Sequence, residues 1–140
     1  MNQIGMNKAT DYKCAIHTFD PEKLPTQETA TRNRFHVHDM GISDTDNGKF
    51  RRVSTIMIEL GHSHIHVLKI DVEGHEKESL PALVKDGTLA HVDQLSIEFH
   101  SVQLMKEGLD LLVQAGFGIV YARREDRCGW CTEVSLVKLR

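Results

Sequence analysis

The sequence predicts an α/β protein built on a doubly wound, mostly parallel sheet. Strand-like apolar runs alternate with segments in which apolar residues recur every three or four positions, as strands and amphipathic helices do in such folds. The run from Val67 to Val72 is almost continuously apolar, which is typical of a parallel strand buried on both faces. The last two strand-like runs have no helix between them, so we expect an antiparallel pair at the end of the chain.

Two short strands are expected in the first third of the chain. Residues 14–19 end at Asp20-Pro21, where proline favours extended geometry before it and cannot donate to a sheet ladder. Residues 35–38 alternate apolar and histidine side chains and end near Gly41-Ile42. The polar segment 22–32 between them is expected to be a loop.

Three amphipathic helices are expected, over residues 52–60, 76–85 and 102–115. Each is followed by a glycine, the residue that most readily takes the left-handed conformation at a helix end. The second helix contains Pro81, which predicts either a kink or a later start near Ser79. The expected apolar stripe of the third helix is Val102, Met105, Leu109 and Leu112.

Four further strands complete the predicted order. They are expected over residues 67–72, 95–99, 117–122 and 133–139. The order is therefore β, β, α, β, α, β, α, β, β, and alternation of this kind implies right-handed crossovers between parallel strands.

The composition is that of an ordinary globular protein. The 140 residues fit one domain of the common size of about 100 to 150 residues, with 40% hydrophobic and 26% charged residues. Seventeen basic against twenty acidic residues give a net charge of −3, and the absence of a basic run argues against nucleic acid as a partner. No segment is apolar enough for a membrane span or a signal core, which predicts a cytoplasmic protein if the chain is complete as written.

Acidic residues and one histidine stand at the predicted ends of two neighbouring strands. Asp71 and Glu73 should point to the same side by strand alternation, and Gly74 lets the backbone turn after them. Glu98 and His100 end the next strand. Since ligands bind beyond the carboxyl ends of parallel strands, we expect these side chains to share one crevice. His100 is the predicted general base, because an imidazole can accept a proton near neutral pH.

Two strings within this region resemble a known family. Lys69-Ile-Asp-Val-Glu-Gly-His-Glu76 and the strand end Ile97-Glu-Phe-His100 are similar to the FkbM-type and related methyltransferase-like proteins, which are class I S-adenosylmethionine-dependent methyltransferases. The resemblance covers most of residues 13–140. It implies a Rossmann-like fold, S-adenosylmethionine as cofactor, and a small-molecule or glycan acceptor.

The resemblance also implies roles for particular residues. Asp20 matches the acid that hydrogen-bonds the cofactor's ribose, although a loop-capping aspartate is the alternative. Gly41 and Ile42 match the strand end that holds adenine, with an ordinary turn as the alternative. The residues matched to positions beside the methyl donor and acceptor are Asp71 for cofactor binding and Glu73, Glu98 and His100 for catalysis.

The N-terminal segment departs from the family pattern. Class I methyltransferases begin with a strand and a glycine-rich turn that lets the cofactor approach the backbone. Residues 1–12 are too polar for a central strand and hold one glycine, Gly5, so we expect a remnant of the first helix there. We therefore expect residues 1–140 to be a single, N-terminally truncated domain. The alternatives are a strand supplied by another chain, or a degenerate relative that no longer methylates.

The leading hypothesis is O-methyl transfer to a hydroxyl of a sugar or small metabolite, with activity expected of the complete domain and an inactive fragment as the alternative. A non-catalytic partner-binding module is the second hypothesis, with exposed strand edges able to form a homo-oligomer. A metal-dependent hydrolase using Asp71, Glu73 and His100 is the third, since carboxylates and imidazole also bind divalent ions. For Glu76, stabilisation of the positive end of its helix is the alternative to a role in such a site.

The cysteines and a histidine-rich turn suggest no further site. Cys128 and Cys131 lie in the loop between the last two strands, and without a second pair we expect a structural loop whose thiols can join under oxidation. The odd third thiol, Cys14, mildly favours a reducing compartment. Alternate histidines precede the strand at Val67 and are expected to be solvated rather than convergent: His62, His64 and His66.

Overall fold

The computed structural model describes residues 14–22, 34–126 and 128–140. These residues form two compact units. The first unit comprises the described residues up to Gly41 together with Asn47–Phe50, and the second comprises Ile42–Asp46 and the described residues from Arg51 to Arg140. The expected helix remnant over 1–12 lies outside the described residues.

The first unit contains the two short strands that the sequence predicts. β1 (Ile16–Phe19) and β2 (Phe35–His38) pair in parallel, with Ile16 opposite Phe35 and Phe19 opposite His38. The aromatic rings on the pair stack on one another, the Phe19 and His38 centroids lying 4.6 Å apart. The backbone N–H of Asp20 extends the ladder by donating to the carbonyl of His38.

A short hairpin leads from the first unit to the second. Its strands are β3 (Gly41–Ile42) and β4 (Phe50–Arg51), which form a two-stranded sheet around the polar turn expected from the sequence. Gly41 is buried, and a Cβ atom added there would lie 2.6 Å from Cε1 of Phe50. Close packing within the first unit therefore requires glycine at this position.

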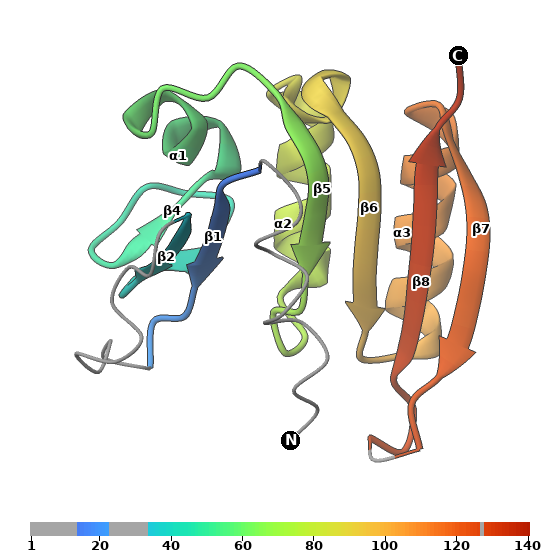
Figure 1. Ribbon diagram of the computed structural model, residues 1–140. Coiled ribbons are helices and arrows are strands. Elements are labelled where there is room, and N and C mark those ends of the chain that lie inside the picture. The colour runs from blue at the N-terminus through green and yellow to red at the C-terminus, as the bar shows by residue number, and fades with distance from the viewer. Residues whose placement is uncertain (1–13, 23–33, 127) are drawn as a thin grey trace. The chain divides into compact units, whose positions relative to one another are not determined.

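The second unit is built on a four-stranded mixed sheet (Figure 1). In spatial order its strands are β5 (Ile65–Ile70), β6 (Val92–Phe99), β8 (Thr132–Lys138) and β7 (Phe117–Arg124). β5 and β6 are parallel, whereas β6 with β8 and β8 with β7 are antiparallel. The expected antiparallel pair at the end of the chain is confirmed.

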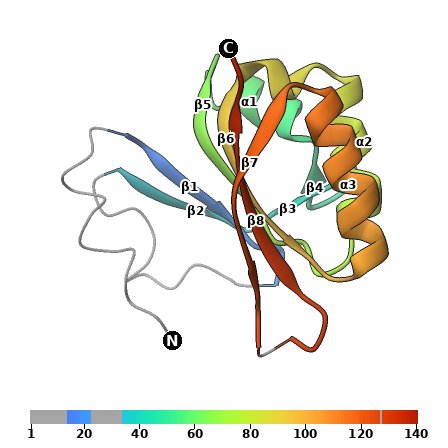
Figure 2. The ribbon, with the colours of Figure 1, turned by 90° about the vertical axis from the view of Figure 1, so that its right-hand side faces the viewer.

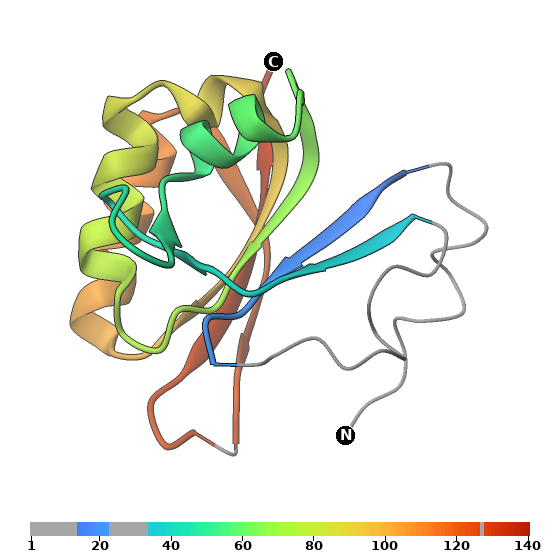
Figure 3. The same cartoon turned by 90° about the vertical axis from the view of Figure 1, so that its left-hand side faces the viewer.

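Three α-helices and one 3-10 turn accompany this sheet. They are α1 (Val53–Glu59), α2 (Glu76–Lys85), the 3-10 turn η1 (Thr88–His91) and α3 (Val102–Gln114). Figures 2 and 3 show the three α-helices on the same face of the sheet. α2 begins at Glu76 and contains Pro81, so the later start near Ser79 is wrong. None of the described helices is long and apolar enough to cross a membrane.

The core of the second unit lies between the helices and the sheet face they cover. Leu68 and Ile70 of β5 are buried there, whereas Val67 is 59% exposed and Lys69 is exposed. The expectation that β5 is buried on both faces is therefore wrong. A strand covered by helices on one face needs apolar residues only at alternate positions, and Lys69 follows that rule.

Helix α3 contacts the core through three of the four predicted residues, since Leu112 is buried and Met105 and Leu109 are partly buried against the core. Val102 is 60% exposed because it begins the helix, just after the cap at Ser101, whose Oγ accepts from the backbone N–H of Leu104. Gly108 is buried instead, and a Cβ there would lie 2.5 Å from Cε1 of Phe99. The missing side chain lets α3 approach the sheet closely.

Candidate functional site

The candidate site surrounds His100 at the carboxyl ends of the parallel strands β5 and β6 (Figure 1). Nε2 of His100 lies 3.3 Å from Oε2 of Glu73 and 3.7 Å from Oδ1 of Asp71. On the other side of the ring, Nδ1 lies 2.9 Å from Oε1 of Glu76. We refer to Asp71, Glu73, Glu76 and His100 as the His100 cluster. The structure thus brings together three residues that the sequence assigned to one crevice, and adds a fourth.

Glu76 anchors the cluster from the first position of α2. Its side chain is 1% exposed, and Oε1 accepts hydrogen bonds from His100 and from the backbone N–H of Gly74, 3.1 Å away. The N-terminal end of the helix favours a carboxylate at this position, as the sequence suggested. A buried carboxyl group needs hydrogen-bond partners, and His100 and the backbone of Gly74 supply them to Oε1. The pairing of Glu76 with His100 is not predicted by the sequence pattern, although both residues belong to the two strings that carry the family resemblance.

A tight turn after β5 places Glu73 in the His100 cluster. β5 ends at Ile70, so strand alternation does not explain why Asp71 and Glu73 converge. Glu73 and Gly74 instead have successive positive φ angles of 51° and 98°. Among the described residues, Glu73 is the one residue other than glycine with a positive φ angle. Such a conformation costs on the order of 1 to 3 kcal/mol for a side chain other than glycine. The convergence of the two acids was predicted correctly, but from the wrong geometry.

The charges around His100 favour its protonated form. Burial lowers the pKa of the imidazole, but the hydrogen bond from His100 to Glu76 and the negative charges of Glu76, Glu73 and Asp71 outweigh it, so the pKa is raised above 6.5. An imidazolium donates protons in hydrogen bonds and cannot accept one. In this arrangement His100 therefore holds the acids together rather than acting as an unperturbed base.

Glu98 lies beside the cluster but is not among its hydrogen-bonded or ion-paired members. Burial is the main cause that raises the pKa of its carboxyl group, and the negative charge of Asp71 adds to the shift. Glu98 also faces Cys128 and Cys131, with its ligand atom and their sulfurs all within 4.8 Å of one another. The two cysteines form a disulfide, which confirms the expected pairing, and Cys14 is unpaired and exposed.

The predicted cofactor-binding residues of the first half of the chain have local structural roles. Oδ1 of Asp20 accepts from the backbone N–H of Glu22 at 3.0 Å, which is the geometry of a loop-capping aspartate. Gly41 is required by packing against Phe50, and Ile42 packs on the core of the second unit. Binding of ribose by Asp20, and of adenine by Gly41 and Ile42, stays a prediction.

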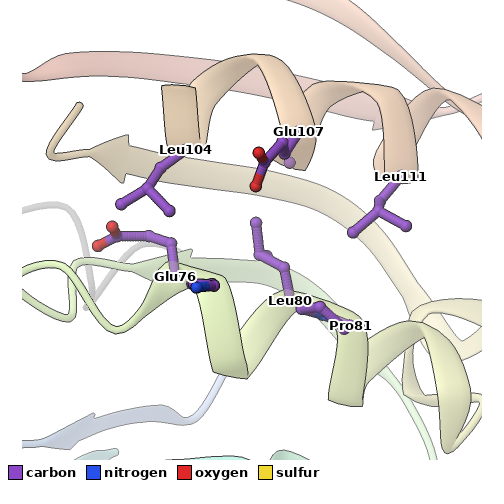
Figure 4. A pocket seen from close by; sticks show the side chains of 8 residues that line it. Glu76, Leu80, Pro81, Leu104, Glu107 and Leu111 are labelled. Carbon is purple, nitrogen blue, oxygen red and sulfur yellow. The ribbon is translucent and has the colours of Figure 1, made fainter. Parts of the chain in front are cut away.

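A small cavity lies next to the cluster, between α2 and α3 (Figure 4). Leu80 projects from α2 and Leu104 and Leu111 from α3, with Glu76 at one end (Figure 4). Its volume of about 40 Å³ is large enough for a water molecule but far below the roughly 300 Å³ of the smallest usual ligand pockets. A nucleoside cofactor would therefore bind outside this cavity.

The raised pKa of His100 predicts how stability depends on pH. Because the folded-state pKa exceeds the unfolded value near 6.5, protonation of His100 adds stability that is fully present below about pH 6.5 and is lost as the pH rises through the raised pKa. Glu76→Gln removes the largest raising influence and should move this loss to lower pH. Urea unfolding from acidic to alkaline pH, with NMR titration of the His100 ring, measures both effects. Glu78→Gln, at an exposed position of the same helix, is the control, and an equal shift in both variants would contradict the assignment.

Comparisons with known proteins place the chain among methyltransferase-like sequences. The family model described as the methyltransferase FkbM domain matches residues 6–119. The probable methyltransferase-like protein 24 of Rattus norvegicus is 29% identical over 97 residues, which cover 62% of this chain and 26% of the relative. The human protein of the same name is 28% identical over the same shares, so the chain spans about a quarter of these relatives. No solved structure matches the chain significantly.

Proposed function

The chain belongs to the methyltransferase FkbM domain family, and from this premise we propose that it forms part of an S-adenosylmethionine-dependent methyltransferase with a Rossmann-like fold. We further propose a hydroxyl oxygen of a sugar or small metabolite as the acceptor. The observation that supports the proposal is the His100 cluster, which stands at the carboxyl ends of adjacent parallel strands. Ligands of open α/β sheets bind at this position.

The accessible acids of the cluster fit a cationic cofactor. The side chains of Asp71 and Glu73 are 39% and 86% exposed, whereas Glu76 is buried and occupied by His100. Three carboxylates against one imidazolium leave an excess of negative charge, which suits the sulfonium and ammonium groups of S-adenosylmethionine. When bound, this cofactor supplies an electrophilic methyl group. Asp71 is the residue that we assign to holding it, with Asp20, Gly41 and Ile42 assigned to its nucleoside.

His100 and Glu73 are the residues that we assign to the acceptor. Asp71 and Glu73 favour the imidazolium form of His100 only while their charges are uncompensated. A positive charge bound beside Asp71 and Glu73 would lower the pKa of His100. Its Nε2 could then accept a proton from a hydroxyl group. Nδ1 stays bound to Glu76, which fixes the orientation of the ring. Glu98 is assigned to the same step through its charge, because it has no hydrogen bond to His100 in the described structure.

Binding of S-adenosylmethionine tests the proposal directly. In the full-length protein that carries this segment, Asp71→Asn should weaken binding by at least about tenfold, or roughly 1.4 kcal/mol, because a carboxylate facing the cation is lost. Isothermal titration calorimetry gives the dissociation constants, and mass spectrometry of the product identifies a methyl ether. Asp110→Asn, an exposed position on α3, is the matched control. Equal affinity of wild type and Asp71→Asn, or no binding by the full-length protein, would overturn the proposal.

Two other functions are distinguished by simple measurements. The ligand atoms of Asp71, Glu73 and His100 lie within 4.8 Å of one another, an observation that favours metal-dependent hydrolysis as the second candidate. Stoichiometric metal that is lost in His100→Asn would support it. A partner-binding module would use the sheet edges at β5 and β7, and gel filtration of a stable oligomer without cofactor affinity would favour that role.

A further inference from the structure

Another group of histidine and aspartate side chains lies at the opposite ends of β5 and β6 from the His100 cluster. His64 immediately precedes β5, His66 is its second residue, and Asp93 is the second residue of β6. The parallel register places Ile65 opposite Val92, so the starts of the two strands are adjacent. The six residues of β5, each rising roughly 3.3 Å, separate this group from the site proposed above.

The three side chains converge on a small volume. Nε2 of His64 lies 2.8 Å from Oδ2 of Asp93, and the rings of His64 and His66 meet edge to face with centroids 4.9 Å apart. One ligand atom from each of the three residues lies within 4.8 Å of the others. The expectation that these alternate histidines do not converge is therefore wrong for two of them. β6 begins at Val92 rather than at the predicted Leu95, and its parallel pairing with β5 brings Asp93 beside them.

We propose that His64, His66 and Asp93 bind a divalent transition-metal ion, with Zn²⁺ as the preferred ion. Two imidazoles and one carboxylate form a nitrogen and oxygen ligand set that Zn²⁺ accepts, with water completing the coordination. Ligand atoms about 2.1 Å from a tetrahedral ion lie roughly 3.4 Å from one another. The most widely separated pair of ligand atoms therefore needs to approach by at most about 1.4 Å, while Nε2 of His64 and Oδ2 of Asp93, now 2.8 Å apart, need to separate slightly. All three residues are exposed, which allows this movement without disturbing the core.

Existing contacts of Asp93 set the strength of the site. Its carboxylate already pairs with His64, and the positive charge of Arg140 acts on it as well. A bound ion replaces the hydrogen bond between His64 and Asp93 with two metal–ligand bonds, and it competes with Arg140 for the carboxylate. We therefore expect binding weaker than that of a closed structural zinc site.

Titration of the metal-free chain with ZnCl₂ in chelator-free buffer tests the site. The wild type should bind one ion, and His66→Gln and Asp93→Asn should each weaken binding by at least about tenfold. His62→Gln, in the same histidine-rich turn but outside the group, should bind as the wild type does. Circular dichroism confirms that each variant is folded, so that a loss of affinity is a loss of ligands.

Three outcomes would overturn the proposal. These are no saturable binding by the wild type, equal weakening in His62→Gln and His66→Gln, and binding that is lost in His100→Asn but kept in His66→Gln. The last result would place the ion in the His100 cluster, whose ligand atoms also lie within 4.8 Å of one another. The first two results do not bear on S-adenosylmethionine binding, so the zinc proposal can fail while the proposed function stands. The third result would instead support the metal-dependent alternative at the His100 cluster.

Discussion

Replacement of His100 by alanine is expected to destabilise the protein by about 3 to 5 kcal/mol, because it leaves a buried carboxylate without its partner. Glu76 is 1% exposed and its Oε1 accepts from His100 at 2.9 Å. The loss of a charged partner for a buried ion costs far more than the loss of a surface pair. Urea unfolding at pH 6, where the protonated form of His100 is favoured, measures the free energy of unfolding.

A double-mutant cycle separates this pairing from the loss of a packed ring. Glutamine at position 76 carries no charge, so adding Glu76→Gln to the His100→Ala variant should cost much less stability than adding it to the wild type. His75→Ala is the matched histidine control, because His75 is exposed and makes no side-chain cap hydrogen bond. It should change stability by no more than about 0.5 kcal/mol. An equal loss of stability on Glu76→Gln in the wild type and in the His100→Ala variant would contradict the pairing of Glu76 with His100.

Gly108→Ala is expected to destabilise the protein by about 1 to 3 kcal/mol, although alanine is the better helix former. The added Cβ would lie 2.5 Å from Cε1 of Phe99 and 2.9 Å from Cδ1 of Leu80. Phe99 is fully buried, so its ring has little freedom to move away. Thermal or urea unfolding of the variant measures the cost.

Two further variants test whether crowding is the cause. Phe99→Leu removes the atoms nearest the new Cβ, so the cost of Gly108→Ala should be smaller in that background. Gly129→Ala is the control, because a Cβ there would meet no atom within 4 Å. Stabilisation by Gly108→Ala would show that α3 can shift without penalty. Since Phe99 directly precedes His100, that result would also indicate that the His100 cluster tolerates a displacement of Phe99.

Several features of this protein follow from local sequence alone. The three helices were predicted to within about one residue at each end, because their apolar spacing and the glycines after them act over a few positions. The antiparallel pair of β7 and β8 follows from two alternating runs joined by a polar loop. The placement of Asp71 and His100 at neighbouring strand ends also follows, since the strands and their order along the chain are visible in the sequence.

Tertiary structure decided which residues pair across the fold. The insertion of β8 between β6 and β7, and the burial of β5 on one face, depend on strands far apart in the sequence. The partnership of Glu76 with His100 and that of His64 with Asp93 span 24 and 29 positions. Periodicity and capping reveal whether a segment is a helix or a strand, because they arise from residues close together in the sequence. The partner of a buried charge is set by where the packed elements meet, and only the folded chain brings those elements together.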